Sequence, residues 1–186
     1  YSNFINHHLS TLLDELYDYD NGQCWFVETM QIPSWLIQNG YTDSSSRSYV
    51  IQAWKDDVSK KKAEELCINA DVAIFGADSL EYQIMRTKTG KLSFEVSERW
   101  LKKGILNLLS PRLLRNMWYY HTLFRKKPVY KLCSSAYAAG DQYKMFSFKD
   151  RCYKWGYFTR VDDYDIEASL DNRQATEFRL MWCARF

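Results

Sequence analysis

The residues best suited to chemistry in this chain lie in three short polar stretches. The first, SNFINHH, contains Asn3, Asn6, His7 and His8. Asparagine donates and accepts hydrogen bonds, and histidine gains a charge near neutral pH, so this stretch could hold an anion or a sugar hydroxyl. Ordinary capping of a helix explains any single one of these residues equally well. Two adjacent histidines favour a functional interpretation of the stretch as a whole.

The other two polar stretches each follow an apolar segment, KLSFEVS in one case and PVYKLC in the other. Their candidate residues are Ser97, Glu98, Arg99, Ser135, Tyr137 and Asp141. Each has an alternative explanation. Glu98 and Arg99 could form a surface ion pair, Ser135 and Tyr137 could belong to a helix N-cap, and Asp141 could be solvated in the second turn of a helix.

The spacing of apolar residues predicts the elements that position these stretches. Strands are predicted at 2–4, 23–29, 49–54, 71–77, 91–97, 128–135 and 152–158, and helices at 6–17, 56–70, 79–88, 110–127 and 136–146. Residues 32–48, with a proline, a glycine and a serine run, are expected to form a loop. Strands that alternate with helices predict an α/β fold with a doubly wound, mostly parallel, Rossmann-like sheet.

In such a sheet, ligands bind where the carboxyl ends of the strands meet the following turns. The three polar stretches follow the strands at 2–4, 91–97 and 128–135. Because parallel strands all end at one edge, we expect the three stretches to line one cleft there. Free N–H groups at the first helix would add to an anion site.

Composition excludes several classes of protein. A hydrophobic content of 46%, an aromatic content of 17% and a formal charge of +2 argue against disorder and against nucleic-acid binding. Five cysteines without C-x-x-C spacing, mostly in apolar runs, predict free thiols, and the three histidines give no metal site. The chain has no apolar run of about 18 residues. Dinucleotide, P-loop, nucleophile-elbow and zinc-protease motifs are also absent.

A change in composition near residue 160 predicts a domain boundary. Residues 1–159 are expected to form the Rossmann-like domain, and the polar, acidic residues 160–177 a linker. The segment 178–186 (FRLMWCARF is its sequence) is expected to be the first strand of a second domain. Both ends of the chain suggest a piece of a longer protein.

Taken together, the blocks SNFINHHLSTLLDELY, FVET, DVAIFGAD, KLSFEVSERWLKKG, SPR, PVYKLCSSAYAAGDQ and CYKWGYF resemble one known family. They are similar to the N-terminal domain of bacterial retaining glycosyltransferases of the family 4 type, which have the GT-B fold. The resemblance covers roughly residues 1–158. It implies two Rossmann-like domains across a cleft, the first holding mainly the acceptor and the second mainly the nucleotide-sugar donor.

The resemblance implies transfer of a sugar to a glycan or lipid-linked acceptor with retention, without a metal or other cofactor. His8 and Glu98 are then the expected catalytic residues. The expected substrate-binding residues are Asn3, Asn6, His7, Ser97, Arg99, Ser135, Tyr137 and Asp141. A cytoplasmic enzyme at the inner face of the membrane, with peripheral membrane contact, is the corresponding expectation.

Two other functions remain open on the sequence. A Rossmann-like sensor or binding module without catalysis would use the same sheet edge to hold a small anion. An oxidoreductase is disfavoured, because no glycine-rich dinucleotide fingerprint follows any predicted strand.

Overall fold

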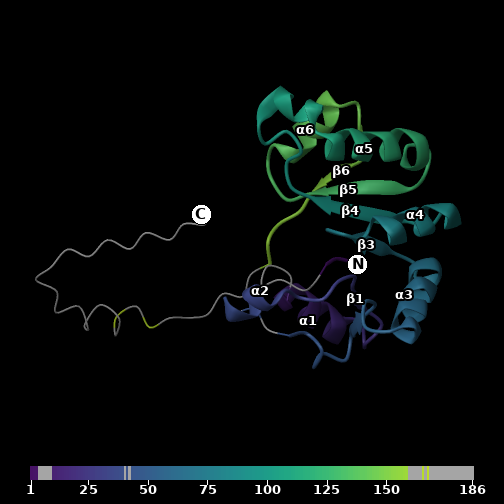
Figure 1. The fold of residues 1–186 in the computed structure, drawn as a ribbon, viewed down its shortest axis with the longest axis vertical. Helices are drawn as coiled ribbons and strands as arrows, with labels where there is room; N and C mark the ends of the chain where they lie inside the picture. The colour runs from purple at the N-terminus through teal and green to yellow at the C-terminus, as the bar shows by residue number, and fades with distance from the viewer. Residues whose placement is uncertain (4–9, 40, 42, 159–164, 166, 168–186) are drawn as a thin grey trace, which may run out of the picture.

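The structure, a computed structural model, describes residues 1–3, 10–39, 41, 43–158, 165 and 167, in which helices and strands alternate (Figure 1). The strands are β1 (Phe26–Glu28), β2 (Val50–Gln52), β3 (Ala73–Phe75), β4 (Ser93–Ser97), β5 (Val129–Cys133) and β6 (Cys152–Lys154). The helices are α1 (Ser10–Tyr19), α2 (Ser34–Gln38), α3 (Asp57–Asn69), α4 (Leu80–Thr89), α5 (Pro111–Tyr119) and α6 (Ala138–Lys144). A 3-10 helix, η1 (Gly104–Leu109), precedes α5, and a π-helix, η2 (Tyr120–Phe124), follows it.

The strands form a parallel arrangement in two parts that the segment 1–3 joins. β1 pairs with β2, and β3, β4, β5 and β6 form a four-stranded sheet in that order. Ser2 forms a parallel bridge with Glu28, and its backbone N–H donates to the Val27 carbonyl at 3.1 Å. On the other side, the Gly76 N–H donates to the Tyr1 carbonyl at 2.7 Å. Segment 1–3 is therefore the central strand.

The resulting strand order is β2, β1, segment 1–3, β3, β4, β5, β6. The chain winds outward from the centre in one direction and then in the other, which is the Rossmann order. The order reverses between segment 1–3 and β3. This confirms the predicted α/β, doubly wound, parallel fold.

Gly76 permits the two strands at this reversal to approach closely. A Cβ atom at Gly76 would lie 2.7 Å from the Ser2 Oγ atom and 3.1 Å from the Ser2 Cβ atom. Contacts below 3.0 Å do not fit ordinary packing. A side chain at position 76 would therefore force Ser2 to shift, and glycine avoids this contact.

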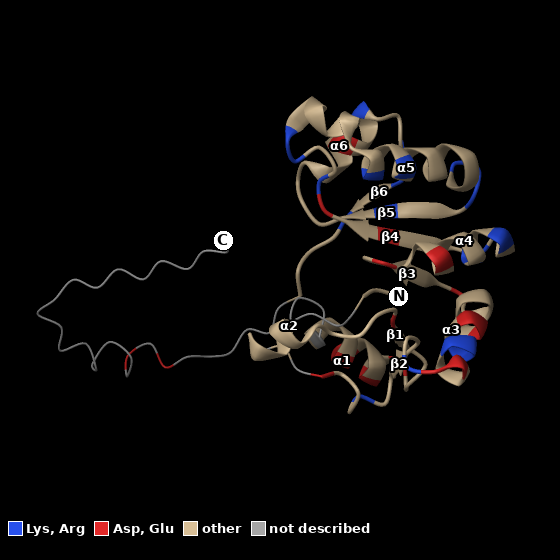
Figure 2. Ribbon diagram, in the orientation of Figure 1, with Lys and Arg blue, Asp and Glu red and all other residues tan. Residues whose placement is uncertain are grey.

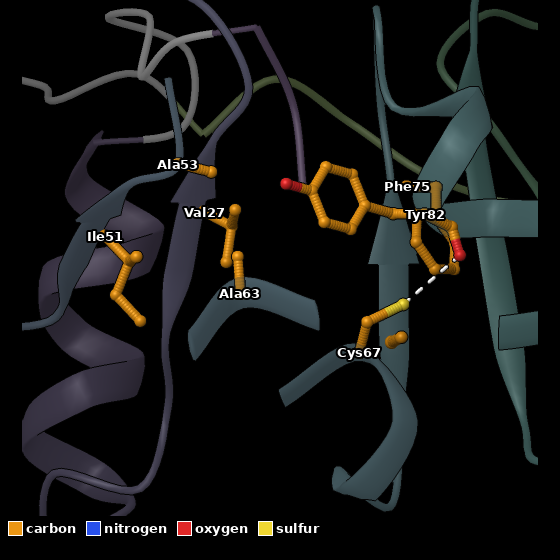
Figure 3. Packing of buried hydrophobic residues seen from close by; sticks show 8 residues of the cluster. Val27, Ile51, Ala53, Ala63, Cys67, Phe75 and Tyr82 are labelled. Atoms are coloured by element: carbon orange, nitrogen blue, oxygen red, sulfur yellow. Dashed lines mark hydrogen bonds between the residues drawn. The ribbon is translucent and has the colours of Figure 1, made fainter. Parts of the chain in front are cut away.

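Helix α3 covers the junction between the two parts of the sheet. Its buried Ala63 lies against Val27, and the thiol of Cys67 donates to the Tyr82 carbonyl at 3.2 Å (Figure 3). The same cluster holds residues of β1, β2, β3 and α4. Asp56 begins this helix, because its carboxylate accepts from the Ser59 N–H at 2.7 Å. One apolar core therefore spans both halves.

Arg86 of α4 is fully buried, and its guanidinium binds the backbone carbonyls at the carboxyl end of α3 and in the turn that follows. Its guanidinium donates to the carbonyls of Cys67 at 2.9 Å, Ile68 at 3.4 Å, Ala70 at 2.6 Å, Asp71 at 2.8 Å and Leu92 at 3.1 Å. Three of these carbonyls lie at the carboxyl end of α3, where a positive charge is favoured by the helix dipole. Burial lowers the pKa of the guanidinium.

The structure also differs from the sequence-based expectations in places. The predicted loop 32–48 contains the short helix α2, and η1 lies where no element was expected. The predicted helix 110–127 changes to π-helical geometry after Tyr119. The expected linker 160–177, apart from residues 165 and 167, and the expected strand 178–186 lie outside the described residues.

Candidate functional site

The carboxyl ends of the strands bring several of the predicted residues to one level. Tyr1 lies opposite Phe75, and Phe75 is in register with Glu95. Asn3 and Ser97 are therefore level with each other, and Ser97 is in register with Cys133. One strand, β3, lies between Asn3 and Ser97, which places them about 10 Å apart across the sheet. The predicted convergence at one edge holds for these residues.

Arg99 is held in a fixed orientation just beyond β4. Its Nε atom donates to Asp141 Oδ2 at 3.1 Å and its Nη2 atom to Asp141 Oδ1 at 3.3 Å. The guanidinium also lies 5.0 Å from the Tyr137 ring centre. The Arg99 side chain is 35% exposed, whereas that of Asp141 is 2% exposed. The pair is therefore bidentate, and it is buried on the carboxylate side.

Two alternatives raised by the sequence are wrong. Asp141 is not solvated, because it lies buried on α6, where it accepts from Arg99 and from the Leu101 N–H at 3.1 Å. Glu98 does not pair with Arg99. It accepts from Lys102, four residues later in the chain, and from the Tyr157 hydroxyl at 2.9 Å. The two charges are adjacent in the chain, but each has its own partners.

The hydrogen bonds of Arg99 leave one nitrogen for a ligand. Nη2 shares a second, longer contact of 3.4 Å with the Leu101 carbonyl. Nη1 makes no hydrogen bond with any described residue. The hydrogen bond to Asp141 raises the pKa of Arg99 further, so its charge is permanent. Arg99 can thus present a positive charge and a donor at the sheet edge.

Glu98 provides a negative group beside that positive one. Its side chain is 53% exposed, and the phenol of Tyr157 anchors one oxygen. Burial, followed by this hydrogen bond, raises the pKa of Tyr157, which keeps the phenol protonated as a donor. Tyr157 lies after β6 and Glu98 after β4, so this hydrogen bond joins the segments that follow two strands far apart in sequence.

Buried hydroxyl groups lie at the same edge. The Oγ atoms of Ser97 and Ser135 are buried and have no hydrogen-bond partner among the described residues. Thr29, directly after β1, has the same property. A buried hydroxyl without a partner costs about 1–3 kcal/mol. Polar groups of this kind accumulate at the carboxyl edge, where a doubly wound sheet binds its ligands.

On the other half of the edge, Asn3 and Glu28 extend the polar lining. Asn3 accepts from the Ser2 hydroxyl at 3.1 Å through its side chain and from the Met30 N–H at 3.2 Å through its carbonyl. Glu28 is buried and accepts from the Ser44 hydroxyl and from Gln52 Nε2 at 3.1 Å. The edge therefore has a second fixed carboxylate.

Three predicted residues cannot be placed. Asn6, His7 and His8 lie outside the described residues, directly after Asn3 in the chain. The structure brings together Asn3, Ser97, Glu98, Arg99, Ser135, Tyr137 and Asp141 at the carboxyl edge of the sheet.

Sequence reasoning missed Glu28, Thr29, Gly76 and Tyr157. Glu28 and Thr29 follow an apolar run in FVET, so the rule that polar residues after a strand line the edge could have found them. Gly76 had a weaker signal, a glycine after an apolar run. Nothing local in the sequence marks Tyr157, whose role depends on a partner 59 residues away.

Neither metal ligation nor membrane spanning has support in the described part of the chain. Those residues contain no group of three or more histidine, cysteine or acidic side chains that could hold a metal ion. None of their helices is long and apolar enough to cross a membrane. The Cys24, Cys67, Cys133 and Cys152 thiols are free, as predicted, while Cys183 lies outside the described residues.

Comparisons of the chain with protein-family models, with curated proteins and with solved structures found no match.

Proposed function

We propose that this chain is the acceptor-side domain of a retaining glycosyltransferase that uses a nucleotide-sugar donor. The observation that carries the proposal is the oriented Arg99 guanidinium at the carboxyl edge, with Nη1 directed to no described residue. It stands beside a carboxylate, Glu98, that the Tyr157 hydroxyl holds. The resemblance in sequence blocks supports the same function.

In the proposed reaction, the leaving diphosphate takes the proton of the acceptor hydroxyl while the sugar passes through a cationic state. The domain then contributes position and charge rather than a nucleophile. Arg99 would bind a phosphate or hydroxyl of the acceptor or the departing diphosphate. Glu98 would orient the acceptor hydroxyl or balance the cationic sugar. His7 and His8 would hydrogen-bond the same groups.

Asp141 would act through Arg99 and is a positioning residue. Its buried carboxylate fixes two nitrogens of the guanidinium, which reduces the freedom that a ligand would otherwise have to remove. Tyr137 limits the remaining movement by stacking. The donor-binding groups of the family belong to a second domain, so the activity of the whole enzyme depends on residues beyond this edge.

The experiment is a transfer assay on the protein encoded by the whole gene, with a panel of nucleotide sugars and with glycan and lipid-linked acceptors. Release of the nucleoside diphosphate and the mass of the product are measured. Arg99→Gln is expected to lower kcat/KM by about 10²-fold or more. Asp141→Asn is expected to raise KM more than it lowers kcat, because it loosens the guanidinium.

Arg47 gives a matched control. It pairs with Asp14 at 3.2 Å, and its side chain is 26% exposed, close to the 35% of Arg99, although Asp14 is more exposed than Asp141. Arg47 precedes β2, at the opposite edge of the sheet. Arg47→Gln should leave transfer unchanged. Equal losses in the Arg99 and Arg47 variants, or no transfer with any donor, would contradict the proposal.

The alternative of a small-anion sensor makes a different prediction. A sensor would bind an anion through Arg99 without turnover of any nucleotide sugar. Binding of inorganic phosphate that Arg99→Gln abolishes, in a whole-gene protein inactive toward the entire panel, would favour the sensor over the transferase.

A further inference from the structure

The region from η1 through α5 exposes a row of large apolar side chains. Ile105, Leu106 and Leu109 of η1 are 75%, 70% and 79% exposed, and Leu114 and Trp118 of α5 are 51% and 58% exposed. We refer to these five residues as the η1–α5 surface. They are not the apolar side chains that anchor the two elements. Leu108, Leu113 and Met117 do that, by packing with Leu101 and Met145.

Helix α5 is therefore apolar on two faces. Leu113 and Met117 face the core, while Leu114 and Trp118, four residues apart, form a stripe on the exposed side. A helix whose only task was to cover the sheet would have polar residues there. The exposed stripe continues the apolar residues of η1, which directly precede α5.

The same region is strongly basic. Residues 102–127 contain seven lysines and arginines and no aspartate or glutamate, although the whole chain has a net charge of only +2. Arg112 and Arg115 belong to α5 and are exposed. Figure 2 shows blue without red on α5, whereas α3 carries both colours. Of the seven, Lys102 is paired with Glu98.

From this combination we infer that the η1–α5 surface binds the surface of an anionic lipid membrane, with its aliphatic and indole side chains inserted at the headgroup boundary. Exposed Leu, Ile and Trp side chains gain from burial in that boundary, and flanking lysine and arginine side chains are attracted to anionic headgroups. Membrane binding of this kind does not depend on the proposed transferase activity.

Two other occupants fit the observations less well. A second copy of the chain would place the same basic surface on both partners of a symmetric dimer, so like charges would face each other. A nucleic acid would match the charge but would give no environment for five aliphatic and indole side chains. An anionic membrane matches both features.

The surface also lies close to the candidate site. η1 follows the carboxyl end of β4 through the loop that carries Glu98 and Arg99. In that loop, Asn107 of η1 donates to the Trp100 carbonyl at 2.9 Å and accepts from the Lys103 N–H at 2.8 Å. A membrane bound at η1 would therefore be adjacent to the edge at which an acceptor is proposed to bind.

The test is flotation of the 186-residue chain with vesicles of phosphatidylcholine alone or with one-third phosphatidylglycerol. Compared with the neutral vesicles, the anionic vesicles should bind the chain at least about fivefold more strongly for each basic residue that lies near the headgroups. This difference should fall with added salt. The double variant Leu114→Ser/Trp118→Ser should lower binding about tenfold or more. The double variant Arg112→Gln/Arg115→Gln should lower binding to anionic vesicles about 25-fold.

Helix α2 supplies the matched control. Trp35 and Ile37 are 55% and 49% exposed, close to the values for Trp118 and Leu114. Trp35→Ser/Ile37→Ser should leave vesicle binding within about twofold. Circular dichroism checks that each variant is folded.

Several results would overturn the inference. One is equal binding to neutral and anionic vesicles, and another is an equal loss in the α2 and α5 variants. A third is a concentration-dependent dimer that Leu114→Ser/Trp118→Ser dissociates while vesicle binding is absent, since the surface would then be covered by a second copy.

Discussion

Arg86 offers the sharpest test of how the fold is held together, because its fully buried guanidinium donates to backbone carbonyls and to no carboxylate among the described residues. We expect Arg86→Met to lower the free energy of unfolding. Methionine keeps most of the aliphatic volume of the stem, so the loss of hydrogen bonds is separated from the loss of packing.

The magnitude follows from the geometry. Four of the five carbonyl contacts are between 2.6 and 3.1 Å, and the contact to Ile68 at 3.4 Å is too long to count fully. At a net value of about 1 kcal/mol for each of the four bonds, the expected loss is about 4 kcal/mol. Burial also lowers the pKa of Arg86, which shows that the charge itself is costly to bury, so about 3 kcal/mol is the lower expectation.

The assay is urea unfolding followed by far-ultraviolet circular dichroism, with Arg112→Met as the control at an exposed arginine. The control should stay within about 0.5 kcal/mol of the parent. Arg86→Lys should lie between the parent and Arg86→Met, since lysine keeps the charge but has three donors. A loss below about 1 kcal/mol, or a gain in stability, would refute the reasoning, because the cost of burying the charge would then equal or exceed the hydrogen bonds.

Three further outcomes can be measured on the same chain. Gly76→Ala should destabilise the protein by about 1–3 kcal/mol through the contact with Ser2. In a double-mutant cycle, Ser2→Gly should restore much of this loss, whereas additive changes in the free energy of unfolding would show that the close approach is not the cause. Burial raises the pKa of Cys67 to about 11, above its unfolded value, so the buried neutral thiol contributes fully to stability below about pH 9 and this contribution is lost as the pH rises toward 11. Cys67→Ala should therefore make the free energy of unfolding fall less steeply between about pH 9 and 11, and an unchanged slope would contradict this. A hydrogen bond from Cys152, together with the weaker effect of the Lys131 charge, outweighs burial and lowers the pKa of Cys133 to about 7. A small alkylating reagent at about pH 7.5 should therefore modify Cys133 before Cys67, as peptide mass mapping can determine, and the reverse order would refute this.

Much of the fold could be predicted from the sequence because its signals are local. The apolar run DVAIFGA contains β3, and Asp56 caps α3 as its position suggested. Each of these depends on a few neighbouring residues. The strand ends were less predictable. β1, β2 and β6 are each three residues long, since pairing with neighbouring strands and not the apolar pattern decides where a ladder stops.

The helices missed by the sequence analysis have equally clear causes. α2 is five residues long and begins after Pro33, a residue that the pattern marked as part of a loop. Its short apolar stretch carries no complete helical period. η1 has three residues per turn and exposes most of its apolar side chains, so the usual helical spacing does not describe it.

For the candidate site, the sequence predicted positions better than partners. The rule that polar residues follow parallel strands placed Ser97, Glu98 and Arg99 at the carboxyl edge. It could not predict that Arg99 would pair with a carboxylate 42 residues later, or that Asp141 would be buried. Such pairings depend on how α6 packs over the loop after β4. They require the tertiary structure.

Segment 1–3 pairs with β1 on one side and with the chain around β3 on the other, which has a consequence for the order in which the protein assembles. The hydrogen bond from the Tyr1 nitrogen to Ile74 closes a loop across 73 positions, whereas every other neighbouring pair of strands is joined by a single crossover. Long loops cost more entropy to close, so the two lateral parts of the sheet gain their pairing earlier than the seam between them. The level arrangement of Asn3 with Ser97 exists only once that seam is closed. The candidate site at this edge is thus expected to form late in folding, and brief opening of the seam would dismantle it while β3 to β6 remained paired.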